Sequence, residues 1–518
     1  MSATRWASRS EAWKLGAGAG ATIAAVLLAW ALTVDYPHAA YGFFSDASTY
    51  YGLGHSLADD GDFVFRKEDL VRVWREFPSG PEGIFLKRGS DPDLRLDGSL
   101  PFVHVDVHPD TDPNRLYFAK SFLYPLFAAP FIWLVGTNGF LVLHAIVLVV
   151  AFICGYAFLV TRTPPVLALL LAGTFVFVSV APVYLVWLTP DLFNLGLVML
   201  GYFFWLYKEV ATAARPEGGP RSRWLVGERS DLVAAVWLGL ATFSKPTHVL
   251  LMLPVLALLV WRRRLLRAIG IGLVYSAVVL GFVAVNIKIT GEANFQGGDR
   301  KTFYSGAESK GFPFQTDAQT FDTTGIGRAT NSVPLDVLVN RDAVVDVFRH
   351  NLLYFFFGRH TGFAIYYLPG MVALVAFLVR RRQQSAWGWL VLAGGVGSAI
   401  VLMLYMPFTY SGGGGPVGNR YFLGVYPVFL FLLPAFATPW AAVLTAAASA
   451  LFVAPILSNP FYSSFHPGEH TKTGLYRVLP LELSLVNDLP VNVSPSRSRQ
   501  PLGGVPPISG YFMDDNAF

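Results

Sequence analysis

The sequence predicts an all-α polytopic membrane protein with about 11–13 transmembrane helices and large outer loops. Composition supports this prediction, because hydrophobic residues make up 53% of the 518-residue chain and charged residues only 14%. A soluble globular domain carries about 25% charged residues. In addition, apolar runs recur along the whole chain, and basic residues cluster in short segments between them, as cytoplasmic loops do. The pI of about 9.1 is therefore not evidence for nucleic-acid binding.

The first apolar run, 15–34, follows basic residues at positions 5, 9 and 14 and lacks a clear cleavage site. We interpret it as a retained span with a cytoplasmic N-terminus. A polar region, 35–120, follows and is expected to form outer loop 1. The other candidate spans are 121–135, 138–160, 166–188, 191–207, 231–244, 246–261, 267–287, 363–379, 386–407, 421–437 and 439–457.

A second polar region, 288–360, interrupts these runs and is expected to form outer loop 2. Together the runs and loops form one transmembrane domain, 1–457. The remaining segment, 458–518, is polar and is expected to be an extracytoplasmic tail. It stops soon after an aromatic and acidic stretch, which we interpret as the beginning of an incomplete strand.

Basic clusters set the predicted orientation of the chain. The Arg residues within 221–229, 262–264 and 380–382 are expected to be cytoplasmic. This places the hairpin tip at 244–246, outer loop 2, the Gly-rich segment 411–415 and the tail on the outer face. The number of crossings between 120 and 160 must then be odd. Either the short, Pro-interrupted run 121–135 is re-entrant or one boundary upstream of 208 differs from this assignment, and both alternatives remain open here. Frequent Ala, Gly and Arg favour a bacterial inner membrane with a periplasmic outer face.

Asp46 is the first candidate functional residue, because its carboxylate follows the first span at the membrane surface. One interpretation is structural, since Ser45 or Asp46 suits the N-cap of a helix over Ala47–Asp59. The other is a general base at the mouth of a membrane cavity. Both interpretations remain open at this point.

Three cations near predicted outer ends are candidate phosphate ligands: Lys120, Lys245 and Arg420. Lys245 stands at a hairpin tip, and Arg420 follows a Gly-rich segment whose backbone can approach a phosphate closely. The alternative is that these side chains only extend to the interface. Further candidates for substrate binding are Asp191, Arg359, His360 and Tyr50.

Metal and cofactor signals are weak. The acidic residues between 91 and 112 do not match an EF-hand, and Pro-punctuated Asp of this kind favours solvated turns. We therefore assign no metal site and expect no required cofactor, with a divalent metal left open. Cys154 is the single cysteine, so the sequence holds no disulfide pair.

Five short motifs, taken in order, resemble a known family. They are Ser45-Asp46-Ala47-Ser48-Thr49-Tyr50-Tyr51, Lys120-Ser121-Phe122-Leu123-Tyr124-Pro125, Thr189-Pro190-Asp191, Ser244-Lys245-Pro246 and Gly418-Asn419-Arg420-Tyr421. The series is similar to polyprenyl-phosphate-dependent glycosyltransferases of the C-type fold (GT-C), including protein O-mannosyltransferases and lipid A aminoarabinose transferases. The resemblance covers roughly 1–457 and rests on the order of the motifs.

The resemblance implies that Asp46 is the catalytic base and that Lys120 and Arg420 hold the donor phosphate. It implies inverting transfer of a sugar from a polyprenyl-phosphate donor, with membrane lipids around the enzyme and a lipid, glycan or protein as acceptor. O-mannosyltransferases have an Asp-Glu pair where this chain has Asp46-Ala47. This departure argues against a protein O-mannosyltransferase proper and leaves the acceptor open.

Three other classes are compatible with the composition. A transporter or lipid flippase would favour mid-span charges and inverted repeats, whereas here the charges gather at predicted outer ends. A lipid-linked glycan polymerase or ligase would not need an Asp after the first span. A membrane scaffold would not need these charges on one surface. Replacement of Asp46 separates the enzyme from these alternatives.

Overall fold

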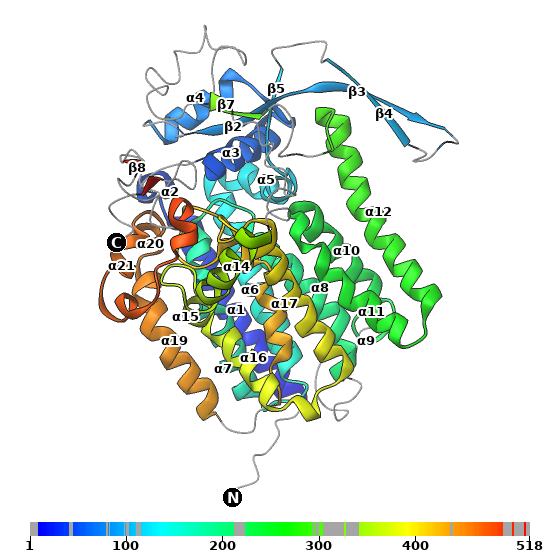
Figure 1. Ribbon diagram of the computed structural model, residues 1–518, viewed down its shortest axis with the longest axis vertical. Helices are drawn as coiled ribbons and strands as arrows, with labels where there is room; N and C mark the ends of the chain where they lie inside the picture. Colours follow the sequence, from blue (N-terminus) through cyan, green and yellow to red (C-terminus); the bar gives the residue numbers. More distant parts are fainter. Residues whose placement is uncertain are drawn as a thin grey trace, which may run out of the picture.

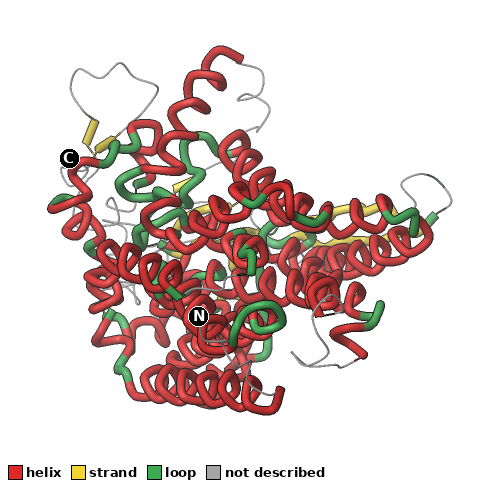
Figure 2. The backbone as a smooth tube through the Cα atoms, turned by 90° about the horizontal axis from the view of Figure 1, so that it is seen from below, coloured by secondary structure: helices red, strands yellow, loops and turns green. Residues whose placement is uncertain are grey.

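The computed structural model is a mostly helical bundle with a layer of strands at one end (Figure 1). It describes residues 9–40, 45–78, 81, 83–97, 99, 103–109, 115–211, 223–293, 295, 300–303, 326–327, 341–435, 439–489, 500–501 and 512–513. Viewed from below, helices account for most of the described backbone and strands for a few short segments (Figure 2). The predicted helical membrane architecture is confirmed in this coarse form.

Among the described residues, five helical stretches are long and apolar enough to cross a membrane, which indicates a multi-pass membrane protein. They comprise α1 (Arg9–Thr33), the α5–α6 stretch (Leu123–Leu159), α12 (Leu265–Thr290), α17 (Ala386–Tyr405) and α19 (Trp440–Ser458). The α5–α6 stretch is central, because 83% of its most apolar window is buried, against 11% for α12. The surface of α12 is therefore largely apolar and open to lipid.

The remaining helical elements, with the two helices of the α5–α6 stretch given separately, complete the bundle and its ends. In the first half they are α2 (Tyr36–Ala39), α3 (Ser45–His55), η1 (Ser56–Asp60), α4 (Lys67–Glu76), α5 (Leu123–Val135), η2 (Gly136–Asn138), α6 (Gly139–Leu159), α7 (Pro165–Phe177), η3 (Ala181–Val186), α8 (Asp191–Ala211), α9 (Arg223–Val226), α10 (Ser230–Ser244), η4 (Pro246–Met252) and α11 (Leu253–Trp261). In the second half they are α14 (Arg341–Phe357), α15 (Phe363–Tyr366), α16 (Leu368–Val379), η7 (Arg381–Gln383), α18 (Arg420–Leu423), η8 (Tyr426–Leu432), α20 (Pro460–Phe465), α21 (Pro467–Thr471), η9 (Gly474–Val478) and η10 (Leu483–Asp488).

Four of the predicted spans, 166–188, 246–261, 363–379 and 421–437, are not single long helices. The run 166–188 divides into α7 and the 3₁₀ segment η3, and 421–437 contains the four-residue α18 followed by η8. Pro182 and Pro427 lie near the start of the two 3₁₀ segments, where proline is tolerated but interrupts a longer α-helix. Apolar composition identified these runs, but it does not distinguish a span from a buried 3₁₀ turn.

The outer loops are not purely helical or irregular, which corrects the all-α prediction. A five-stranded antiparallel sheet has the order β1 (Val64–Phe65), β5 (Leu116–Phe118), β2 (Ile84–Arg88), β6 (Arg300–Phe303) and β7 (Ile326–Gly327). It joins strands from both predicted outer loops, since β2 pairs with β6 in the register Ile84↔Phe303. The buried ion pair between Lys87 and Glu292, 3.1 Å apart, reinforces the same junction.

A second correction concerns the acidic segment of outer loop 1, where we expected turns. Instead β3 (Ser90–Leu96) and β4 (Val103–Pro109) form a hairpin that projects beyond the end of α12 (Figure 1). Asp91 pairs with His108 across this hairpin. Two further short strands, β8 (Gln500–Pro501) and β9 (Phe512–Met513), pair near the end of the chain; most of the predicted tail after 489 lies outside the described residues.

Helix α5 runs beside α3, with both of its ends on the sheet side of the bundle. At their starts, the Lys120 ammonium group contacts the Asp46 carboxylate. At their ends, His55 Nε2 lies 3.0 Å from the Thr137 hydroxyl, just past the last turn of α5. A 13-residue helix is about 20 Å long, shorter than the bilayer core of about 30 Å. Between 120 and 160, α6 alone therefore runs the length of the bundle, which agrees with the odd crossing number inferred from the basic clusters.

Candidate active site

Asp46 lies in the first turn of α3, where two cations hold its carboxylate. Lys120 Nζ is 2.6 Å from Oδ1, and Arg420 Nη2 donates to Oδ2 over 2.8 Å. Because α3 begins at Ser45, Asp46 is inside the helix rather than at its N-cap. These two contacts join Asp46 to residues far away in sequence.

Asp191 is a second carboxylate in the same cluster. It begins α8, and its Oδ1 is 3.0 Å from Lys245 Nζ, while Oδ2 is 3.2 Å from Arg420 Nε. The hydroxyl of Thr189 also donates to Oδ2 over 2.8 Å. Arg420 therefore bridges the two carboxylates, with Nη2 on Asp46 and Nε on Asp191.

The five ionic groups alternate in sign in the order Lys120, Asp46, Arg420, Asp191 and Lys245. Their side chains are largely buried: the three cations are 8–15% exposed and Asp191 is 4% exposed, whereas Asp46 is 22% exposed. Three cations against two carboxylates leave one excess positive charge. Charges removed from water are costly unless they are paired, so this cluster favours an anionic ligand.

All five groups line one cavity of about 230 Å³, together with Tyr50. Six of the eight residues selected from the sequence thus meet in one place. The other lining residues are Pro190, Ser244, Pro246, Thr247, Phe295, Tyr405, Met406 and Tyr421. One wall is aromatic, with the Tyr421 ring 3.9 Å from Lys245 Nζ. The cavity combines fixed charge with apolar walls, as small-molecule sites usually do.

The charges shift the acidity of the cluster. Burial alone would raise the pKa of Asp46, but the adjacent Lys120 and Arg420 outweigh burial and hold this pKa well below its usual value. For Lys120, burial lowers the pKa, although the Asp46 carboxylate opposes that effect. With no ligand bound, Asp46 is therefore an ionised carboxylate with both oxygens engaged.

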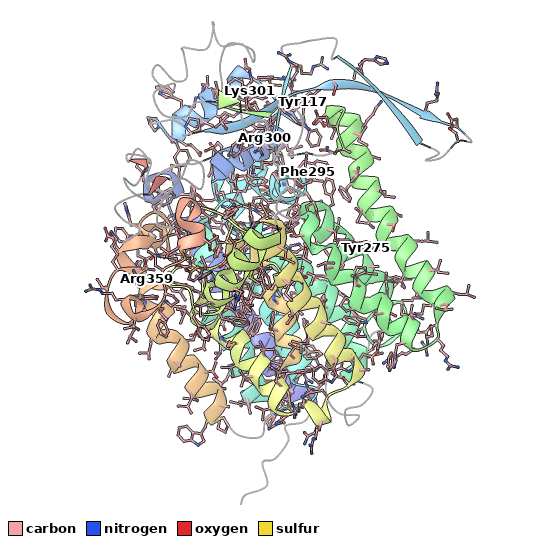
Figure 3. The ribbon with its side chains drawn as sticks, in the orientation of Figure 1. Tyr117, Tyr275, Phe295, Arg300, Lys301 and Arg359 are labelled. Atoms are coloured by element: carbon pink, nitrogen blue, oxygen red, sulfur yellow. The ribbon has the colours of Figure 1, made fainter. Side chains whose placement is uncertain are left out.

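The strand layer contributes a second aromatic contact. The ring of Phe85 in β2 lies 4.8 Å from Lys120 Nζ and 4.8 Å from the Arg300 guanidinium carbon. Arg300 and Phe295 both lie near the sheet end of the bundle (Figure 3). Phe85 thus separates Lys120 from a further cation of β6, within the sheet that joins the two outer loops.

Sequence reasoning missed several of these residues. Tyr421 stands directly after Arg420 in a motif that was recognised, so its position beside a candidate ligand was a usable signal. Tyr405, Phe295 and Phe85 had no such signal. They reach the site through long-range packing and strand pairing, which a single aromatic residue in a loop does not reveal.

Arg359 and His360 are not among the described residues that line this cavity. The Arg359 guanidinium donates to the Leu479 carbonyl over 3.3 Å, and Figure 3 places Arg359 beside the C-terminal segments. The His360 ring is fully buried, and burial lowers its pKa to about 3. These residues form a separate junction with the segment 477–482.

Metal-ligand geometry is not evident in the part of the chain that the structure describes. Within these ranges, there is no group of three or more His, Cys, Asp or Glu side chains placed to hold a metal ion. Cys154 is a buried free thiol in α6.

Comparisons of the chain with protein-family models, with curated proteins and with solved structures found no match.

Proposed function

We propose that this chain is an integral membrane glycosyltransferase of the GT-C type. It transfers a sugar from a polyprenyl-phosphate donor to an acceptor at the extracytoplasmic face, with inversion and with Asp46 as general base. The observation that carries this proposal is the alternating charge cluster with one excess positive charge. It lines a cavity at one end of a bundle that contains five long apolar helices.

The orientation rests on the basic segments. The turns that contain Arg262–Arg264 and Arg380–Arg382 lie at the end of the bundle opposite the sheet, where α1 also begins (Figure 1). If this end is cytoplasmic, as basic loops favour, the cavity opens on the periplasmic side of a bacterial inner membrane. A polyprenyl chain then lies among the apolar helices while its phosphate reaches the cluster.

Donor binding explains how an ion-paired carboxylate can act as a base. A phosphate offers oxygens to the same cations, and a guanidinium fork binds two of them well. When the phosphate takes Asp46's place beside Lys120 and Arg420, the carboxylate loses the charges that depress its pKa. Asp46 then becomes a stronger base at the moment when the donor is in place.

The reaction is a single displacement. Asp46 accepts the proton of an acceptor hydroxyl, whose oxygen attacks the anomeric carbon. The bond from that carbon to the phosphate oxygen breaks, and its electron pair leaves with the polyprenyl phosphate. The cations offset the charge that develops on the leaving phosphate, which is worth several kcal/mol in a site that excludes water. One displacement at one carbon inverts its configuration.

The test is sugar transfer from radiolabelled polyprenyl-phosphate sugars, measured in lipid, glycan and protein fractions of membranes that contain the chain. The same sugars on nucleotide carriers test whether the lipid is needed. Asp46→Asn is the informative variant, and Asp35→Asn is its control, because Asp35 follows the first span with a side chain that is 65% exposed.

We expect transfer from a lipid-linked donor by the wild type and by Asp35→Asn, and a loss of 100-fold or more in Asp46→Asn. A general base typically contributes about 10²–10⁴-fold. Equal transfer by all three proteins would eliminate Asp46 as the base. Movement of the intact donor across vesicles without transfer would instead identify a transporter.

A further inference from the structure

A second buried junction joins the C-terminal part of the chain to the segment before α15. The Glu482 side chain is completely buried, and its Oε1 accepts three hydrogen bonds. They come from the His360 amide at 2.7 Å, the Thr361 amide at 2.8 Å and the Thr361 hydroxyl at 3.0 Å. The Arg359 amide donates to the Pro480 carbonyl over 3.0 Å. The segment 480–482 thus satisfies three consecutive backbone amides, 359–361.

Close approach of the carboxylate depends on Gly358. A Cβ at this position would lie 2.4 Å from Glu482 Oε1 and 2.5 Å from the Tyr354 carbonyl oxygen. Both distances are far below a normal contact. Only glycine leaves room here for the Glu482 side chain against the end of α14.

This junction connects directly to the turn that carries Arg420. The His360 carbonyl accepts a hydrogen bond from the Gly418 amide over 2.7 Å. The Asn419 side chain accepts from the Phe422 amide over 2.9 Å and so caps α18, which begins at Arg420. Three links therefore separate Glu482 from Arg420: Glu482 to the His360 amide, His360 to Gly418, and the turn from Gly418 to Arg420.

We propose that Glu482 is a positioning residue for the cavity: with segment 480–482 it fixes 359–361, which in turn fixes the Gly418–Arg420 turn. Glu482 does not line the cavity and touches none of its five ionic groups. Its effect passes through Arg420, which must reach Asp46 and Asp191 at once. The inference refines the proposed transferase, but its first test needs no transfer reaction.

That test is hydrogen–deuterium exchange of the purified full chain. In Glu482→Ala we expect faster exchange of the Gly418 and Arg420 amides, with α6 and α17 unchanged. Glu482→Gln keeps an acceptor oxygen at Oε1 and should restore slow exchange. Glu469→Ala removes an exposed carboxylate from the same C-terminal region and should match the wild type. Unchanged exchange at 411–423 in a folded Glu482→Ala protein would overturn the proposal.

Glu482→Asp serves if the alanine variant does not fold, because the shorter side chain withdraws the oxygen while a carboxyl group is kept. We expect it to show the same local increase in exchange. An increase spread evenly over all helices would instead indicate a purely structural role and would contradict positioning of Arg420.

The second test measures binding of a polyprenyl phosphate without sugar. We expect about a tenfold rise in Kd for Glu482→Ala, about 1.4 kcal/mol, and little change for Glu482→Gln. In a protein that already carries Arg420→Gln, Glu482→Ala should cause no further loss of affinity, since Glu482 acts through Arg420. Additive losses of affinity in the double variant would refute the proposal that Glu482 acts through Arg420. If the wild type binds no polyprenyl phosphate, the proposed function fails, while the exchange result still decides the role of Glu482.

Discussion

Asp46→Asn is expected to change donor binding and catalysis in opposite directions. The substitution removes the negative charge that both Lys120 and Arg420 contact at 2.6 and 2.8 Å. On the proposed mechanism, a donor phosphate must first displace that carboxylate in the wild-type protein. In the variant Lys120 and Arg420 no longer face this negative charge, although Arg420 keeps its contact with Asp191, and the excess positive charge of the cluster rises from one to two.

The magnitude follows from the ion pairs. Two unit charges 4 Å apart attract by about 4 kcal/mol at an effective dielectric constant of 20, and the net value of a charged hydrogen bond is about 1.5–3 kcal/mol. If about 1.4 kcal/mol of this competition is relieved, Kd for polyprenyl phosphate falls about tenfold. Loss of the base lowers kcat by about 10²–10⁴-fold.

The assay pairs equilibrium binding of polyprenyl phosphate with single-turnover transfer, at one salt concentration, for the wild type, Asp46→Asn and Asp35→Asn. Thermal unfolding is measured in parallel, because Lys120 and Arg420 lose a charged partner in the variant. Weaker binding by a folded Asp46→Asn protein would show that the carboxylate supports donor binding and does not compete with it. That result would refute the expectation that the donor phosphate replaces the Asp46 carboxylate beside Lys120 and Arg420.

Two further predictions concern stability. Burial raises the pKa of Glu482 from its usual 4.5 to about 7, so the folded state keeps a proton that the unfolded state releases between these values. The free energy of unfolding should fall by about 3 kcal/mol as pH rises from 4.5 to above 7. The Glu482→Gln variant should lack this loss of stability. Unfolding of both proteins at pH 5 and at pH 8 measures the difference. Neutral His360, with its pKa near 3, does not titrate in this window. Separately, Asp231→Asn should lower the free energy of unfolding by about 3–5 kcal/mol without loss of sugar transfer, because Asp231 pairs with Lys208 and Arg267 at the far end of α8. Thermal unfolding and transfer assays on the same preparations check both expectations. A variant as stable as the wild type would contradict the expected loss of stability.

The sequence was sufficient for the helical membrane class and for much of the site's membership. Polar residues at the predicted outer ends of apolar runs must share one surface, and Asp46, Lys120, Asp191, Lys245 and Arg420 do converge. This works because the membrane restricts where charge can lie. The membrane therefore predicts only how far along the bundle axis each of these residues lies, and this prediction is the same for every polar residue at such a position.

The position of a residue along the bundle axis does not specify which neighbours its side chain faces. Arg359 and His360 satisfy the same depth criterion, yet they face the segment 477–482. The sheet was missed for a related reason, since β2 and β6 are short strands that pair across more than two hundred residues. Neither strand has enough length for a periodic signal, and each is stabilised by its distant partner and by the Lys87–Glu292 ion pair.

The Asp46–Arg420 contact also determines when the cavity can exist during synthesis. The two residues are 374 positions apart. At translation rates of about 5–20 residues per second, Arg420 emerges about 20–75 s after Asp46. During that interval Lys120 is already synthesised and is the partner available to the Asp46 carboxylate. The complete cluster of five ionic groups can thus form only late, after most of the chain has been synthesised, and nascent chains that end before residue 420 carry the two carboxylates without the guanidinium that joins them.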